Sequence, residues 1–269
     1  MSEPVPAPPL PTAPAPASPR SAPLRGLLGD FSLDVVVGVV ALFGTSFAVM
    51  VAWGIWRAVA QAQGLDGGSD GPGAAVLMLA AILGMSSAAI LLYFWRRPAS
   101  AAERRQSFAA AARPRTWLLA AGAGVAVFAC SSLAGWLMSA AGIDPVPSNM
   151  VLIEEAARRW PVFLVLFAVF LAPAYEELLF RRVLFGRFLD AGRPWLGLVL
   201  SSVAFALMHE IPGLSANPPA AVALLLAVYA SMGAVFAWVY WRTGSLWAAI
   251  GAHALNNGLA LLAHGIGNG

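Results

Sequence analysis

The chain has 269 residues, of which 59% are hydrophobic and 11% are charged, and its formal net charge is +3. Ordinary soluble domains are about 45–50% apolar and about 25% charged, so this composition excludes a soluble globular protein and predicts a membrane protein. The basic balance does not indicate a nucleic-acid partner, because all 16 basic residues are Arg and they fall between apolar runs.

A Pro-rich segment begins the chain. Residues 1–30 hold nine Pro, at positions 4, 6, 8, 9, 11, 14, 16, 19 and 23, among Ala and Ser. Such a segment lacks backbone donors and apolar bulk, so we expect a disordered, partly polyproline tail over 1–30.

Seven apolar runs follow the tail. A helix of about 20 residues crosses the roughly 30 Å of hydrocarbon in a bilayer, and candidate runs cover 32–56, 74–95, 116–140, 161–186, 194–211, 219–241 and 245–263. The fold is therefore predicted to be all-α, a polytopic transmembrane helix bundle of about seven spans. Three N-terminal helices would occupy 31–150, and a second helix bundle would occupy 151–269.

The linkers indicate how the chain is oriented. The linker 96–115 holds six Arg, which places it in the cytoplasm by the positive-inside rule. Alternation then puts the N-terminus inside and the C-terminus outside. Since the chain has no Lys and abundant Ala, Gly and Pro, as in GC-rich bacterial genomes, we expect a multi-pass protein of a bacterial inner membrane. The single Cys130 lies in an apolar run and allows no intrachain disulfide and no Cys-based zinc site.

Ionisable side chains inside these runs are informative, because each costs roughly 2.5–3.5 kcal/mol to insert. Residues four apart share a helix face, so Glu177 can pair with Arg181, and Glu176 is left to face elsewhere. His253 and Asn257 likewise point together from the last run. Pro173, which cannot donate to the carbonyl of Val169, predicts a kink just before the two glutamates.

Depth in the membrane brings two of these groups together. Glu176 and His209 lie equally far, 16 residues, from the turn at Gly192–Arg193, so an antiparallel helix pair places them at one level. His253 lies only 9 residues from Gly244, which predicts an offset of about 10 Å towards the cytoplasm.

A carboxylate and an imidazole at one level can activate water, and a second imidazole with an amide can stabilise an oxyanion. These side chains are the ones expected in a hydrolase that attacks an amide with water and forms no covalent intermediate. The zinc-protease pattern His-Glu-x-x-His is absent, because no His stands at the required position after His209–Glu210.

Three motifs, in this order, resemble those of the CPBP family, the CAAX prenyl endopeptidases and bacteriocin-processing enzymes, also called the Abi family. They are Glu176-Glu177-x-x-x-Arg181, Phe205-x-x-x-His209 and His253-x-x-x-Asn257, and the resemblance covers roughly 160–263. It implies a membrane-embedded endopeptidase, with 151–269 as its catalytic bundle and a peptide or protein substrate, soluble or bound to the bilayer. It also implies that Glu176 is the general base with His209 on water, that His253 and Asn257 stabilise the oxyanion, and that Glu177 and Arg181 support them.

Other interpretations remain open from the residues. Glu176, His209 and His253 could form a zinc site, although we expect that no metal cofactor is required, because each ligand would come from a different helix. The same family includes non-catalytic proteins of bacteriocin immunity. A proton-coupled transporter could use the same groups as a relay, but such transporters often show two similar halves, which this chain lacks.

Overall fold

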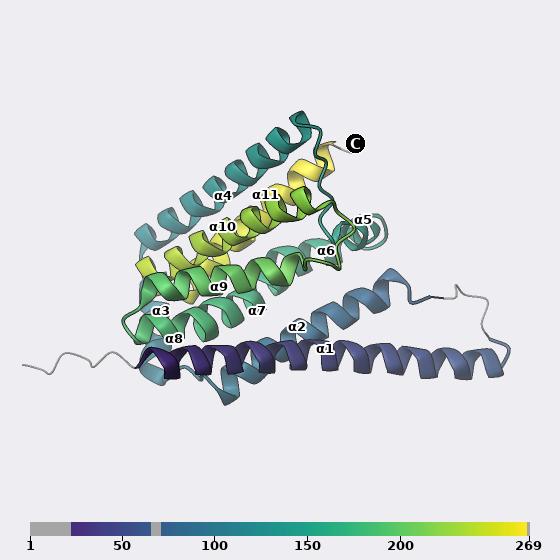
Figure 1. Ribbon diagram of the computed structural model, residues 1–269, viewed down its shortest axis with the longest axis horizontal. Coiled ribbons are helices and arrows are strands. Elements are labelled where there is room, and N and C mark those ends of the chain that lie inside the picture. The colour runs from purple at the N-terminus through teal and green to yellow at the C-terminus, as the bar shows by residue number, and fades with distance from the viewer. Residues whose placement is uncertain (1–22, 66–70, 268–269) are drawn as a thin grey trace, which may run out of the picture.

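The computed structural model describes residues 23–65 and 71–267, and this part of the chain is helical without a β-strand (Figure 1). The long helices are α1 (Leu24–Ala62), α2 (Ala74–Trp95), α4 (Pro114–Ala140), α9 (Pro194–His209), α10 (Pro219–Thr243) and α11 (Leu246–Gly267). Two shorter helices, α3 (Ala101–Ala111) and α5 (Met150–Arg159), lie at opposite ends of the bundle. The predicted all-helical class is confirmed.

The fourth predicted span is a composite of short helices. It runs from Pro161 to Asp190 as α6 (Pro161–Leu166), η1 (Phe167–Leu171), α7 (Ala172–Glu177), η2 (Leu178–Phe185) and α8 (Gly186–Asp190). The segments η1 and η2 are π-helical, with i→i+5 hydrogen bonds.

Six helices of the described chain are long and apolar enough to cross a membrane. The remaining predicted run, 194–211, corresponds to α9, which is apolar but has only 16 residues. The expectation for the tail needs one correction. Helix α1 begins at Leu24, so residues 24–30 are helical, because the apolar run that follows recruits them and Pro23 precedes the first turn. Residues 1–22 of the expected tail lie outside the described residues.

Small residues let α1 and α2 pack closely. A Cβ added to Gly84 of α2 would lie 2.8 Å from the carbonyl oxygen of Leu42 on α1. The Thr45 hydroxyl donates to Ser87 Oγ across the same seam at 2.9 Å. In the rest of the molecule, α9 packs along α10 and α4 along α11.

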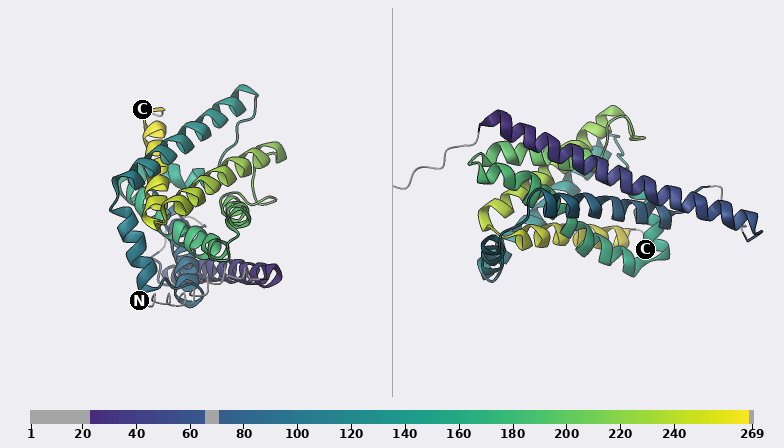
Figure 2. Two further views of the ribbon diagram at one scale, coloured as in Figure 1. Left: turned by 90° about the vertical axis from the view of Figure 1, so that its left-hand side faces the viewer. Right: turned by 90° about the horizontal axis from the view of Figure 1, so that it is seen from below.

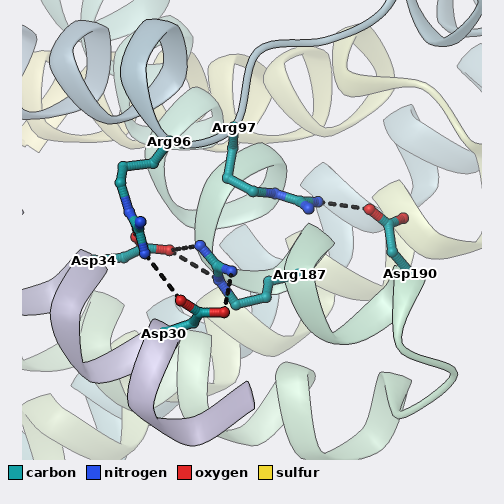
Figure 3. A network of polar contacts seen from close by, with 6 residues as sticks. All are labelled: Asp30, Asp34, Arg96, Arg97, Arg187 and Asp190. Carbon is teal, nitrogen blue, oxygen red and sulfur yellow. Dashed lines mark hydrogen bonds and ion pairs between the residues drawn. The ribbon is translucent and has the colours of Figure 1, made fainter. Parts of the chain in front are cut away.

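An ion-pair network holds α1 against the fourth span (Figure 3). Asp34 of α1 is fully buried, and its Oδ1 accepts from Arg96 Nε at 2.7 Å and its Oδ2 from Arg187 Nε at 2.9 Å. Asp30, one helical turn earlier, lies 3.1 Å from the guanidinium groups of the same two Arg. The N-terminal helices are thus joined to α8, the C-terminal end of the composite span that carries Glu176 and Glu177.

Candidate active site

Two successive carboxylates leave α7 in different directions. Glu177 and Arg181 are both fully buried, and Arg181 Nε lies 2.8 Å from Glu177 Oε2, so the predicted pair is present. The Arg181 guanidinium carbon also lies 4.8 Å from the ring centroid of Phe205 and 5.7 Å from that of Phe236. A buried cation is therefore balanced by one carboxylate and by aromatic faces. This burial excludes the simpler interpretation of the pair as an exposed helix-stabilising contact.

Glu177 determines which ring nitrogen of His253 carries a hydrogen. Its Oε1 lies 2.9 Å from His253 Nδ1, and its Oε2 faces Arg181, so neither oxygen is free to act on water. Because a carboxylate paired with a cation only accepts, Nδ1 of His253 carries the hydrogen. The ring stacks on Phe236, with centroids 4.7 Å apart, and its Nε2 is left to face the opposite direction.

His209 is oriented in the same way by the backbone. Its Nδ1 lies 2.9 Å from the carbonyl oxygen of Phe205, which can only accept, so Nδ1 donates and Nε2 is free. The ring packs between Phe205 and Tyr229, with centroids 4.3 and 4.8 Å away. Packing and one hydrogen bond therefore hold this imidazole in a single orientation.

Glu176 lies where the two imidazoles meet. Its Oε2 is 3.6 Å from His209 Nε2 and 3.9 Å from His253 Nε2, and this oxygen is buried without a hydrogen-bond partner in the described chain. Glu176 Oε2 and the two Nε2 atoms thus converge on one small volume, at separations that leave room for a water molecule between them.

The predicted offset of His253 is wrong, because His253 lies beside both glutamates. The counting argument assumed that the turns at Gly192–Arg193 and at Gly244 lie at the same height. Because His253 Nε2 lies 3.9 Å from Glu176 Oε2 and its Nδ1 lies 2.9 Å from Glu177 Oε1, that assumption does not hold.

Asn257 contacts the kink that precedes the glutamates. Its Nδ2 donates to the carbonyl oxygen of Ala168 at 2.9 Å. The sequence predicted that Pro173 would leave the carbonyl of Val169 without a donor, which assumes an i→i+4 register. In the π-helical register the Ala172 amide donates to Phe167 instead, so the carbonyl that faces the missing donor of Pro173 is that of Ala168. Asn257 supplies this donor from α11.

Several residues of the site were not predicted. Tyr229 and Phe236 of α10 support His209 and His253, and their spacing of seven puts them on one helix face, which is the only signal the sequence offered. Asn256, also buried, donates its Nδ2 to Asn257 Oδ1 at 3.0 Å. Glu210, directly after His209, is fully buried and accepts from the Ser148 hydroxyl at 2.9 Å.

The distances among Glu176 Oε2 and the Nε2 atoms of His209 and His253 do not match those of a zinc site. In tetrahedral coordination at 2.0–2.1 Å, ligand atoms lie about 3.3–3.4 Å apart, which is closer than Glu176 Oε2 lies to either Nε2. Across the described residues no group of three His, Cys, Asp or Glu is arranged to hold a metal ion. The described residues therefore do not form a preset metal site.

Comparison with known proteins matches the second half of the chain. Residues 158–259 match the family described as "Type II CAAX prenyl endopeptidase Rce1-like", and this range contains the three motifs. The chain is also 28% identical over 116 residues to the Bacillus subtilis (strain 168) protein named "Putative membrane peptidase YdiL". That alignment spans 43% of this chain and 43% of the relative, less than half of either. No solved structure matches the chain significantly.

Proposed function

We propose that the chain, whose residues 158–259 match the Rce1-like type II CAAX prenyl endopeptidase family, is a membrane-embedded endopeptidase that hydrolyses peptide bonds with water activated by Glu176. The observation that carries the proposal is the convergence of Glu176 Oε2 with the Nε2 atoms of His209 and His253.

A water molecule between these atoms has two hydrogens to donate, one to Glu176 and one to His209. As the water oxygen attacks the peptide carbonyl, Glu176 takes its proton as general base and later delivers it to the leaving amine. His209 Nε2 accepts the second hydrogen and holds the water in line, because its Nδ1 is committed to Phe205.

His253 has a different role, because Glu177 lies against its Nδ1. The Nε2 of His253 faces the same small volume as Glu176 Oε2, and when this nitrogen carries a hydrogen it can donate to the oxyanion that forms on the attacked carbonyl. Asn257 has a second Nδ2 hydrogen besides the one given to Ala168, and this hydrogen is its contribution to the oxyanion. Arg181 balances the charge of Glu177 and is thereby a positioning residue.

Glu176→Gln tests the proposal. The amide cannot take a proton from water, so we expect turnover to fall by about 10²–10⁴-fold, with unchanged insertion and unfolding temperature. The readout is cleavage of internally quenched peptides, some with a prenylated C-terminal Cys, by the full chain in liposomes. Glu154→Gln, an exposed glutamate on α5, is the matched control and should keep parental turnover.

The same assay tests the need for a metal and the rival functions. We expect parental turnover after dialysis against a chelator, whereas activity lost there and restored by zinc would refute the metal-free mechanism. Turnover retained by Glu176→Gln would remove Glu176 from the base role. A parent chain that cleaves no peptide but shows proton-coupled uptake in the same liposomes would favour the transporter, and one that shows neither would favour a non-catalytic immunity protein.

A further inference from the structure

Helix α3 lies across one end of the bundle, outside the matched family region. Figure 2 shows it crossing the direction of α1 at the end where the spans α4 and α11 begin. This is the end that the positive-inside rule assigns to the cytoplasm. A helix in this position lies in the plane where lipid headgroups meet the protein.

The helix is held firmly in that place. Its Glu103 forms a capping box with Ser100 and an ion pair with Arg182 of η2 at 2.9 Å. The Ser245 hydroxyl donates to the carbonyl of Ser107 at 3.0 Å, and Thr116 Oγ1 donates to that of Ala110 at 2.7 Å. The residues that α3 presents outward therefore belong to a fixed surface.

That surface combines free cations with exposed rings, and we call it the basic–aromatic surface. Its cations are Arg105, Arg113 and Arg115, and its rings are Phe108, Trp117 and Trp247. The three rings are 58%, 45% and 43% exposed, and Phe108 contacts Trp247 with centroids 5.5 Å apart. The three guanidinium groups are exposed and make no ion pair or hydrogen bond with any residue of 23–65 and 71–267.

We propose that the basic–aromatic surface binds the headgroup of an anionic phospholipid of the adjoining leaflet. Unpaired guanidinium groups match a phosphodiester in charge and in donor geometry. The neighbouring Trp and Phe are the residues that settle at the level of headgroups and upper acyl chains. A free phosphate would use only the cations, so the exposed rings select a lipid as the source of the anion. The nearest acidic side chain on α3, Glu103, is already neutralised by Arg182 and does not oppose the ligand.

The test compares phosphatidylglycerol with phosphatidylcholine, added to the full chain in a neutral detergent, with binding followed by native mass spectrometry. The parent should bind phosphatidylglycerol more tightly. Each Arg near an anionic headgroup contributes roughly a factor of five in affinity, so Arg113→Gln/Arg115→Gln should bind about 30-fold more weakly. Arg158→Gln/Arg159→Gln, which removes two exposed charges from α5 at the other end, should bind as the parent does.

Several outcomes would overturn this proposal. They are equal affinity of the parent for the two lipids, equal weakening in the two double variants, and displacement of the lipid by inorganic phosphate at millimolar concentration. If the unfolding temperature of Arg113→Gln/Arg115→Gln in phosphatidylcholine is below that of the parent, the single variant Arg105→Gln takes its place, with an expected weakening of about fivefold.

Discussion

At the scale of single residues, Asn257 combines a structural and a chemical contribution. Asn257→Ala removes the donor to the partly buried carbonyl of Ala168, and leaving a buried acceptor unpaired costs about 1–3 kcal/mol, so we expect a cost near the lower end of that range. It also removes an oxyanion donor, for which a loss of about 10²–10³ in kcat is expected. The measurements are the unfolding temperature and the kinetics of the same preparation.

Pro173→Ala separates the two contributions of Asn257. An alanine at 173 restores an N–H that can reach Ala168 in the π-helical register, so Asn257→Ala should cost little stability in that background. The loss in kcat should remain. If the stability cost is the same in both backgrounds, Asn257 does not serve the kink, and if only KM changes, it is a binding residue.

The residues of the site were predictable to the extent that helical spacing governs them. Glu177 with Arg181 followed from i,i+4 spacing, and Glu176 with His209 followed from equal arms of a hairpin. The partner of Asn257 did not follow, because it depends on the π-helical turn at η1, which no periodicity in the sequence marks. The position of His253 did not follow, because residue counts do not fix the relative heights of two separate hairpin turns.

At the scale of helices, the seam between α1 and α2 depends on Gly84. A Cβ at this position would lie 2.4 Å from Ser46 Oγ and 2.8 Å from the backbone oxygen of Leu42, so Gly84→Ala must push the two helices apart. Overpacking of this kind costs about 1–3 kcal/mol, measured as a lower unfolding temperature. Gly54→Ala on α1 has nothing within 4 Å and should be neutral or stabilising, because Ala is the better helix former. Equal effects of the two changes would contradict close packing at the seam.

Glu210 joins two loops at the opposite end of the bundle from α3. Burial raises the pKa of its carboxyl, but hydrogen bonds from Ser215, Ser148 and Asn217 outweigh this and lower the pKa below the ordinary value of 4.5. A group with a depressed pKa in the folded state stabilises the fold fully above its unfolded pKa, and this stability is lost as pH falls through the folded pKa. The loop around Ser148 should therefore loosen below about pH 4.5.

Hydrogen exchange of the Ser148 amide measures this effect, since that amide donates to Glu210 Oε2 at 3.3 Å. Protection should decrease as pH falls below 4.5 in the parent, after correction for intrinsic exchange. Glu210→Gln has no charge to lose, so its protection should be lower at pH 7 and should not change in that range. A parental pH response in Glu210→Gln would assign the effect to other carboxylates.

At the scale of the whole molecule, the family match begins at residue 158, yet the preceding helices are attached by charged side chains to the span that carries Glu176. The division into 31–150 and 151–269 was predicted from the extent of the family resemblance, which leaves the first three spans outside it. It describes where the proposed chemistry lies, but Asp34, Arg96 and Arg187 connect the two parts (Figure 3). This connection was not predictable, because an Asp in an apolar run and an Arg in a distant linker have no sequence relationship that pairs them.

Asp34→Asn tests whether that connection stabilises the protein. The amide keeps the size of the side chain but leaves Arg96 and Arg187 facing each other without a full countercharge. Breaking a buried ion pair costs about 3–5 kcal/mol. The two Arg side chains are partly exposed, 21% and 12%, so we expect a cost at or below the lower end of that range.

The matched control is Asp190→Asn, which removes a carboxylate that is 54% exposed and lies 2.7 Å from Arg97, so it should cost at most about 1 kcal/mol. The measurement is the unfolding temperature in detergent at low and high salt, where salt should diminish the small effect of Asp190→Asn and leave that of Asp34→Asn largely intact. Arg187 lies on α8, and η2 connects α8 to α7, the helix of Glu176. Asp34→Asn should therefore also lower peptide turnover at temperatures below the unfolding temperature. Parental stability and turnover in Asp34→Asn would mean that α1 is a separate membrane anchor rather than part of the catalytic bundle.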